Sequence, residues 1–187
     1  MGRRGGAGGG RGGGGGDLGG AGGRPRRAEG AMILIVNGPN LNLLGEREPD
    51  VYGRSTLADV EQLVRDACAA WDVEVKAFQS NHEGAILDFL QEHRKKARGV
   101  ILNAGALTHT SYALHDCLKA MPAPAVEVHI SNIHQREAFR HVSVIAPACR
   151  GQIVGLGIRG YLLAAEWLCA EIGAQPRGSE DRKKPSP

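Results

Sequence analysis

Short apolar runs alternate with amphipathic segments through the middle of the chain. Residues 32–37 read MILIVN, a continuous apolar run that ends at a turn, which is typical of a strand buried in a parallel sheet. From Thr56 onward apolar residues recur at helical spacing, and Asp59 stands at the acidic position of a capping box. The pattern predicts strands at 32–37, 73–79, 99–103, 125–130 and 152–155, and helices at 56–71, 81–96, 110–121, 133–139 and 158–172.

Five βα units in a row predict a parallel sheet with helices on both faces. We expect a flavodoxin-like, doubly wound five-stranded parallel sheet within a single α/β domain. In such sheets ligands bind outside the carboxyl ends of the strands, so the residues that end each strand become the first candidates for a site.

Three of the five predicted strands end in polar residues. The first ends in NGPN, residues 37–40, and the third ends in Asn103, with His109 close behind. The fourth carries Glu127 and His129. A single Asn at a strand end is more often a turn residue, but this combination at one edge favours a functional site.

The connection after the first strand is unusually long. It reads LLGEREPDVYGR over residues 43–54, whereas most βα connections take about two to six residues. Long loops in compact domains are often lids, and this one contains Arg47 and Tyr52. The alternative is a solvated surface loop.

Composition separates the two ends of the chain from its middle. Residues 1–30 hold 16 of the 28 glycines and six arginines, so they offer little apolar surface to bury. We therefore expect a disordered Gly/Arg-rich extension at 1–30, a folded domain at 31–175 and a disordered tail at 176–187. The net charge of +3 arises in the two tails, because residues 31–175 sum to −3, and this is no argument for a nucleic-acid-binding domain.

The remaining features indicate an ordinary intracellular protein. No apolar run is long enough to span a membrane, and the first 30 residues contain no apolar stretch of a secretory signal. Four single cysteines without a C-x-x-C pair are typical of reduced thiols, so we expect a cytoplasmic location.

Two further patterns have simpler explanations than the sites they suggest. Residues 155–160, GLGIRG, match a dinucleotide-binding glycine motif, but they lie in the last βα unit and no strand follows to contact a ribose. Tight turning and close helix packing explain them better. The seven histidines lack the spacing of a zinc site, and we expect His93 and His115 to be surface or packing residues.

Five longer blocks of the chain resemble type II 3-dehydroquinate dehydratase. They are NGPNLNLLGEREPDVYG, QSNHEG, ILNAGALTHTSYAL, VEVHISNIHQREAFRHVS and GLGIRGYLLA, and they follow one another in the family's order over residues 32–172. The resemblance implies a lyase that catalyses trans dehydration of 3-dehydroquinate to 3-dehydroshikimate through an enolate, without a Schiff base. This is the third step of the shikimate pathway, and the sequence leaves open whether the role is biosynthetic or in quinate breakdown.

The resemblance also implies the roles of the catalytic residues. Tyr52 is the general base, and Arg47 lowers its pKa, because a free tyrosine ionises only near pH 10. Asn40 holds the water that stabilises the enolate. His129 is the general acid for the leaving hydroxyl, and Glu127, two residues earlier on the same strand face, stabilises its imidazolium form.

Seven further positions match substrate contacts of the family. Asn103 orients the histidine and the leaving hydroxyl, while the backbone N–H groups of Ile130 and Ser131 hold the carboxylate before a helix N-terminus. His109 and Arg140 bind the ring hydroxyls. Arg136 is a second arginine near the site, and Asp116 reaches in from a neighbouring subunit.

The family pattern implies no metal, no cofactor and a homododecamer built from four trimers, with 3-dehydroquinate as the small-molecule partner and neither nucleic acid nor membrane. Two other hypotheses remain. The chain could be a non-catalytic flavodoxin-like binding module, or an RNA-associated protein that acts through its Arg-Gly tail.

Overall fold

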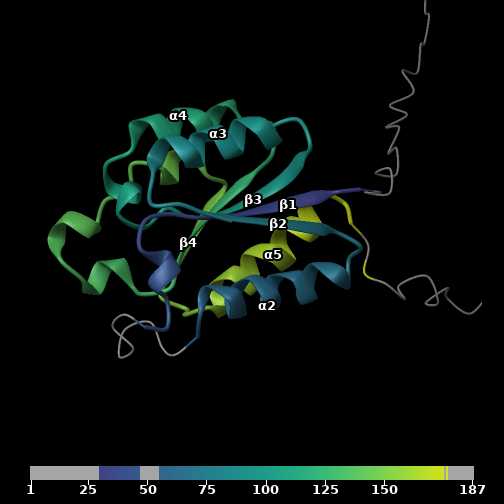
Figure 1. Cartoon of the computed structure of the whole chain (residues 1–187), viewed down its shortest axis with the longest axis horizontal. Helices are drawn as coiled ribbons and strands as arrows, with labels where there is room; N and C mark the ends of the chain where they lie inside the picture. The colour runs from purple at the N-terminus through teal and green to yellow at the C-terminus, as the bar shows by residue number, and fades with distance from the viewer. Residues whose placement is uncertain (1–29, 47–54, 175, 177–187) are drawn as a thin grey trace, which may run out of the picture.

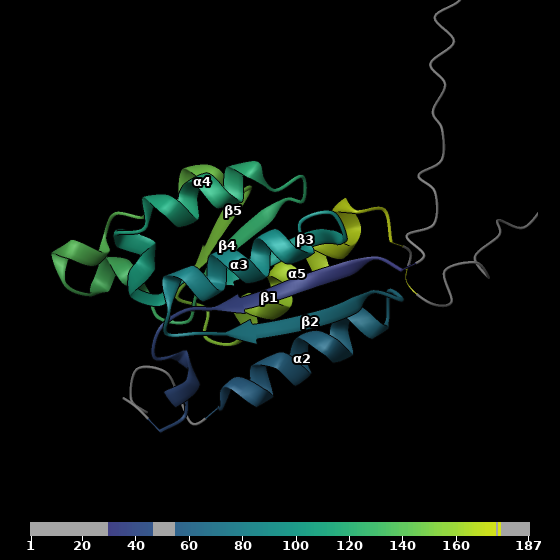
Figure 2. The same cartoon turned by 45° about the horizontal axis from the view of Figure 1, so that its top comes forward.

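Five parallel strands form one sheet in the order β2-β1-β3-β4-β5 (Figures 1 and 2). The computed structural model describes residues 30–46, 55–174 and 176. The strands are β1 (Met32–Asn37), β2 (Glu74–Gln79), β3 (Ala97–Asn103), β4 (Ala125–His129) and β5 (Gly151–Val154). The α-helices within the described residues are α2 (Leu57–Ala69), α3 (Glu83–His93), α4 (Tyr112–Ala120) and α5 (Arg159–Glu171). The predicted doubly wound α/β fold is confirmed.

Helices cover both faces of the sheet. In Figures 1 and 2, α2 and α5 lie on one face and α3 and α4 on the other. Strand β1 is apolar from Met32 to Val36 because it is covered on both faces. Ile33 and Ile35 belong to the core under α2 and α5, while Leu34 and Val36 belong to the core under α3 and α4. Side chains alternate between faces along a strand, so a central strand needs apolar residues at every position.

Helix α2 begins where the sequence predicts. The Thr56 side chain accepts a hydrogen bond from the backbone N–H of Asp59, and the Asp59 carboxylate accepts one from the backbone N–H of Thr56. Together they satisfy two donors that a helix start leaves unpaired.

The fourth predicted helix, at 133–139, is wrong. The chain between β4 and β5 instead forms three short 3-10 helices, Ile133–Gln135, Ala138–Arg140 and Ala146–Ala148. An α-helix needs an apolar stripe to bury, but Ile133 is the one buried residue of the first two turns and Phe139 is 65 % exposed. The strands still pair in parallel, and the segment lies beside the carboxyl edge of the sheet.

The other element boundaries differ from the predicted ones by a few residues. The predicted tails, 1–30 and 176–187, lie outside the described residues apart from Gly30 and Pro176. Within the described part of the chain, no helix has the length and apolarity that crossing a membrane requires. The four cysteines are free thiols, and the Sγ atoms of Cys68 and Cys169 are 3.8 Å apart.

Candidate active site

The polar strand ends lie together because their strands are neighbours in the sheet. Strands β1, β3 and β4 are consecutive in the strand order, and they end at Asn37, Asn103 and His129. A cavity of about 160 Å³ opens at this edge. Eight of the candidate site residues line it: Asn40, Asn103, His109, His129, Ile130, Ser131, Arg136 and Arg140.

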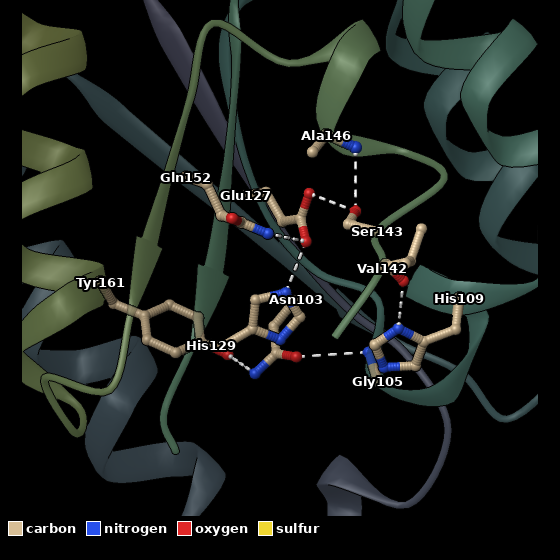
Figure 3. Close-up of polar contacts among 10 residues, drawn as sticks. All are labelled: Asn103, Gly105, His109, Glu127, His129, Val142, Ser143, Ala146, Gln152 and Tyr161. Carbon is tan, nitrogen blue, oxygen red and sulfur yellow. Dashed lines mark hydrogen bonds and ion pairs between the residues drawn. The ribbon is translucent and has the colours of Figure 1, made fainter. Parts of the chain in front are cut away.

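Glu127 and His129 form a buried pair at the end of β4 (Figure 3). Alternation along the strand puts both side chains on one face, and His129 Nε2 lies 2.5 Å from Glu127 Oε1. The carboxylate has no exposed surface and His129 is 6 % exposed. Since Nε2 is held by Glu127, Nδ1 is the ring nitrogen left for a ligand in the cavity.

Two more side chains donate to Glu127. Gln152 Nε2 donates to Oε1 at 2.8 Å, and Ser143 Oγ donates to Oε2 at 2.9 Å (Figure 3). Ser143 Oγ also accepts a hydrogen bond from the backbone N–H of Ala146, which directs its single proton toward the carboxylate. Hydrogen bonds therefore reach both oxygens of this buried carboxylate. The pKa of the nearby Cys149 thiol is raised to about 12, first by burial and then by the negative charge of Glu127.

Both the nitrogen and the oxygen of the Asn103 side-chain amide form hydrogen bonds within the protein. Its Nδ2 donates to Tyr161 Oη at 2.9 Å, and its Oδ1 accepts from the backbone N–H of Gly105 at 3.2 Å (Figure 3). Tyr161 in turn donates to Asn37 Oδ1 at 2.7 Å. Burial raises the pKa of Tyr161 above its ordinary value, so this phenol stays neutral.

His109, Arg136 and Arg140 also line the cavity. His109 Nδ1 lies 2.7 Å from the carbonyl oxygen of Val142, which can only accept, so Nδ1 carries the proton and Nε2 is left for a ligand (Figure 3). Arg140 Nε donates to Glu137 at 2.8 Å, and Arg136 Nε lies 3.6 Å from the same carboxylate. The pKa of Glu137 is lowered by its backbone hydrogen bond and by Arg140.

The backbone of Asn40 is hydrogen-bonded to Asn81, a residue for which the sequence analysis predicted no role. Its backbone has a φ of 68°, an unusual conformation for a residue other than glycine, and its N–H donates to Asn81 Oδ1 at 2.9 Å. Asn81 follows β2, so the neighbouring strand end supports the loop that carries Asn40.

The expected helix N-terminus behind Ile130 and Ser131 is absent. Both residues line the cavity directly after β4, but the next helix is the three-residue 3-10 turn Ile133–Gln135. A single turn has too few aligned peptides to provide a macrodipole, so an anion here would depend on individual N–H groups.

The glycine motif of residues 155–160 has the structural role expected of it. Gly155 has a φ of +82°, and a Cβ there would lie 2.9 Å from the Cβ of Asn132. A Cβ on Gly160 would lie 3.2 Å from side chains of Val128 and Ile153. His93 packs against Phe89, as expected, and its Nδ1–H donates to the carbonyl oxygen of Phe89 at 2.8 Å. No group of three or more potential metal ligands occurs within the described residues.

Four predicted residues are not among those that line the cavity, and one of them is Glu127, which contacts His129. Asp116 is on the exposed side of α4 and does not line the cavity of its own chain. Arg47 and Tyr52 lie outside the described residues, although Leu43 and Leu44 at the start of their connection line the cavity.

Sequence reasoning missed the residues that support the site from behind. Tyr161 carries a detectable signal, since a buried tyrosine hydroxyl needs a hydrogen-bond partner and this one opens an amphipathic helix. Ser143 and Gln152 carry no comparable signal, because their contact with Glu127 depends on how distant segments meet.

A doubly wound sheet that holds a buried imidazole–carboxylate pair beside a cavity at its carboxyl edge is an arrangement suited to an α/β enzyme that transfers protons. The model of the family described as dehydroquinase class II matches residues 31–169, and the chain belongs to that family. The resemblance found in the sequence is therefore confirmed.

Relatives and solved structures agree with this assignment. The chain is 53 % identical over 150 residues to a 3-dehydroquinate dehydratase of Roseiflexus castenholzii, covering 80 % of this chain and 95 % of the relative. It is 48 % identical over 151 residues to a catabolic 3-dehydroquinase of Penicillium rubens, covering 81 % and 97 %. The crystal structure of a type II dehydroquinase from Butyrivibrio crossotus superimposes with a TM-score of 0.72 at 46 % identity, covering 74 % of this chain and 97 % of that one.

Proposed function

We propose that this enzyme is a lyase that converts 3-dehydroquinate to 3-dehydroshikimate by trans dehydration through an enolate, as the third step of the shikimate pathway. The relatives named 3-dehydroquinate dehydratase support the substrate. The observation that carries the chemistry is the buried His129–Glu127 pair, which aims one ring nitrogen at the cavity and holds the other on a carboxylate.

His129 acts as the general acid in this proposal. It transfers a proton to the leaving hydroxyl as the carbon–oxygen bond breaks, so that the group departs as water. Glu127 positions the ring and balances the positive charge of the imidazolium. The enolate collapses back to the ketone and supplies the electron pair of the new carbon–carbon double bond.

The base must remove a proton from the carbon next to the ketone. We assign this step to Tyr52, with Arg47 stabilising the tyrosinate, because both match the family's positions. Asn40 holds the water that donates to the enolate oxygen. Asn40 lines the cavity, which supports this placement.

The remaining candidates bind the substrate. The N–H groups of Ile130 and Ser131 take its carboxylate, and His109 and Arg140 take ring hydroxyls, with Arg136 and Asn103 beside them. Asp116 acts from a neighbouring subunit of the proposed homododecamer, which suits its exposed position outside the cavity of its own chain. The cytoplasmic location and the freedom from cofactors stay predictions.

The decisive experiment follows the ultraviolet absorbance of the conjugated enone after 3-dehydroquinate is added. Purified protein is compared with Tyr52→Phe, which keeps the ring and removes the ionisable hydroxyl. We expect absorbance to rise with the parent chain and not with the variant. A rise in both would remove Tyr52 from the role of base, and no rise with folded parent protein would favour a non-catalytic binding module.

A further inference from the structure

Three buried polar side chains from distant parts of the chain form one line of hydrogen bonds behind the cavity. Asn37 ends β1, Asn103 ends β3, and Tyr161 lies in the first turn of α5. Their exposed fractions are 0 %, 5 % and 0 %. Asn103 is the one member of the three that also lines the cavity.

The direction of this line is set by a backbone group that can only donate. The N–H of Gly105 donates to Asn103 Oδ1, which leaves Nδ2 as the end of the amide facing Tyr161. Tyr161 Oη accepts there, so its single proton goes to Asn37 Oδ1. Reversing the Asn103 amide would place its NH₂ group against the Gly105 N–H, with two donors facing each other.

The far end of the line shows that this direction has a cost. Asn37 Nδ2 is buried and has no hydrogen-bond partner in the described part of the chain. A buried donor without a partner is unfavourable, so the orientation is imposed from the Gly105 end and tolerated at the Asn37 end.

We propose that Tyr161 is a positioning residue that locks the Asn103 amide with its second Nδ2–H available to the cavity. The site then presents a hydrogen-bond donor at this point and is complementary to an oxygen acceptor, a ring hydroxyl oxygen of the substrate. Tyr161 acts through Asn103 and does not contact the substrate. This inference rests on the proposed dehydration of 3-dehydroquinate.

Tyr161→Phe tests the lock, because it removes the hydroxyl and keeps the ring in the core. We expect kcat to fall about 10-fold while KM changes by less than about 3-fold, since an amide free to rotate loses an interaction needed in the transition state. The matched control is Tyr112→Phe, the same chemical change at a side chain that is 72 % exposed on α4. Circular dichroism confirms that each variant is folded before kinetics are compared.

A double-mutant cycle separates positioning from general damage to the core. If Tyr161 acts through Asn103, adding Tyr161→Phe to Asn103→Ala leaves kcat at the value of Asn103→Ala alone. An equal fall of kcat in both backgrounds overturns the inference, as does an unchanged kcat in Tyr161→Phe.

If Tyr161→Phe does not fold, Asn37→Ala is the variant that tests the same inference. It keeps the phenol and removes the acceptor of its proton, so the hydroxyl can turn and loosen the same lock. A lower kcat that disappears in the Asn103→Ala background supports the inference, and an unchanged kcat overturns it. If the parent chain shows no turnover, both the proposed function and this inference are overturned. If the parent chain turns over and Tyr161→Phe has the same kcat, this inference alone is overturned.

Discussion

Glu127 has no exposed surface, and three side chains form hydrogen bonds with its carboxylate. A buried carboxylate without partners would be strongly unfavourable, and the hydrogen bonds from His129, Ser143 and Gln152 compensate for its removal from water. The same contacts fix the position of the His129 ring. The chemistry at the cavity therefore depends on side chains that do not reach it.

We predict that Glu127→Gln lowers kcat about 100-fold with a smaller effect on KM. The side chain keeps its size, but it loses the charge that balances the imidazolium and places an NH₂ group against donors. Steady-state kinetics with 3-dehydroquinate measure the change. Glu171→Gln makes the same substitution on the partly exposed carboxylate paired with Arg150 and is the control. Equal kcat values for Glu127→Gln and the parent chain would contradict this role of Glu127.

Among the secondary-structure elements, the carboxyl ends of the neighbouring strands β1 and β3 are in direct contact. The backbone N–H of Gly38 donates to the carbonyl oxygen of Asn103 at 2.8 Å, which joins the exit of β1 to the exit of β3. A Cβ on Gly38 would lie 2.2 Å from the carbonyl oxygen of Ala104, a backbone atom that cannot swing away. Glycine is required here because two strand ends must approach each other beneath the cavity.

Gly38→Ala is therefore expected to lower the free energy of unfolding by about 3 kcal/mol, because the strand exits must separate. Equilibrium unfolding in urea at one fixed protein concentration measures the loss. The matched control is Gly84→Ala in α3, where a Cβ would have no neighbour within 4 Å and where helix propensity favours alanine by up to about 1 kcal/mol. Equal stabilities of the two variants would show that the strand exits can separate at little cost.

The family model matches residues 31–169, which is only part of the chain. The family model begins at residue 31, where the Gly/Arg-rich segment ends. The Arg- and Gly-rich composition of that segment is the feature that suggested an RNA-associated protein. The dehydratase proposal assigns it no part in the reaction.

Deleting residues 1–30 is expected to leave kcat/KM for 3-dehydroquinate within about 2-fold of the full chain, because every candidate catalytic residue lies beyond residue 39. The enone assay measures it. A full-length variant in which glutamine replaces the six arginines of residues 1–30 separates the effect of charge from the effect of length. A large loss of turnover on deletion would contradict the proposed domain boundary, and tail-dependent RNA binding would favour the alternative function.

Local patterns in the sequence determined most of the elements and the edge that carries the site. The apolar run before Asn37 and the capping box at Thr56 depend on neighbours a few residues away, so strand and helix could be identified there. Polar strand ends at Asn103 and His129 then located the candidate site, because parallel strands end at a common edge.

Only the tertiary structure decided which distant side chains support that site. Gln152 reaches Glu127 because β4 and β5 pair with these two residues opposite each other, and Tyr161 joins strand ends 124 and 58 residues away. The failure of 133–139 to form an α-helix has the same origin, since that segment has little apolar surface to bury against the sheet. Periodicity describes one element at a time, whereas register and contact depend on how all the elements pack together.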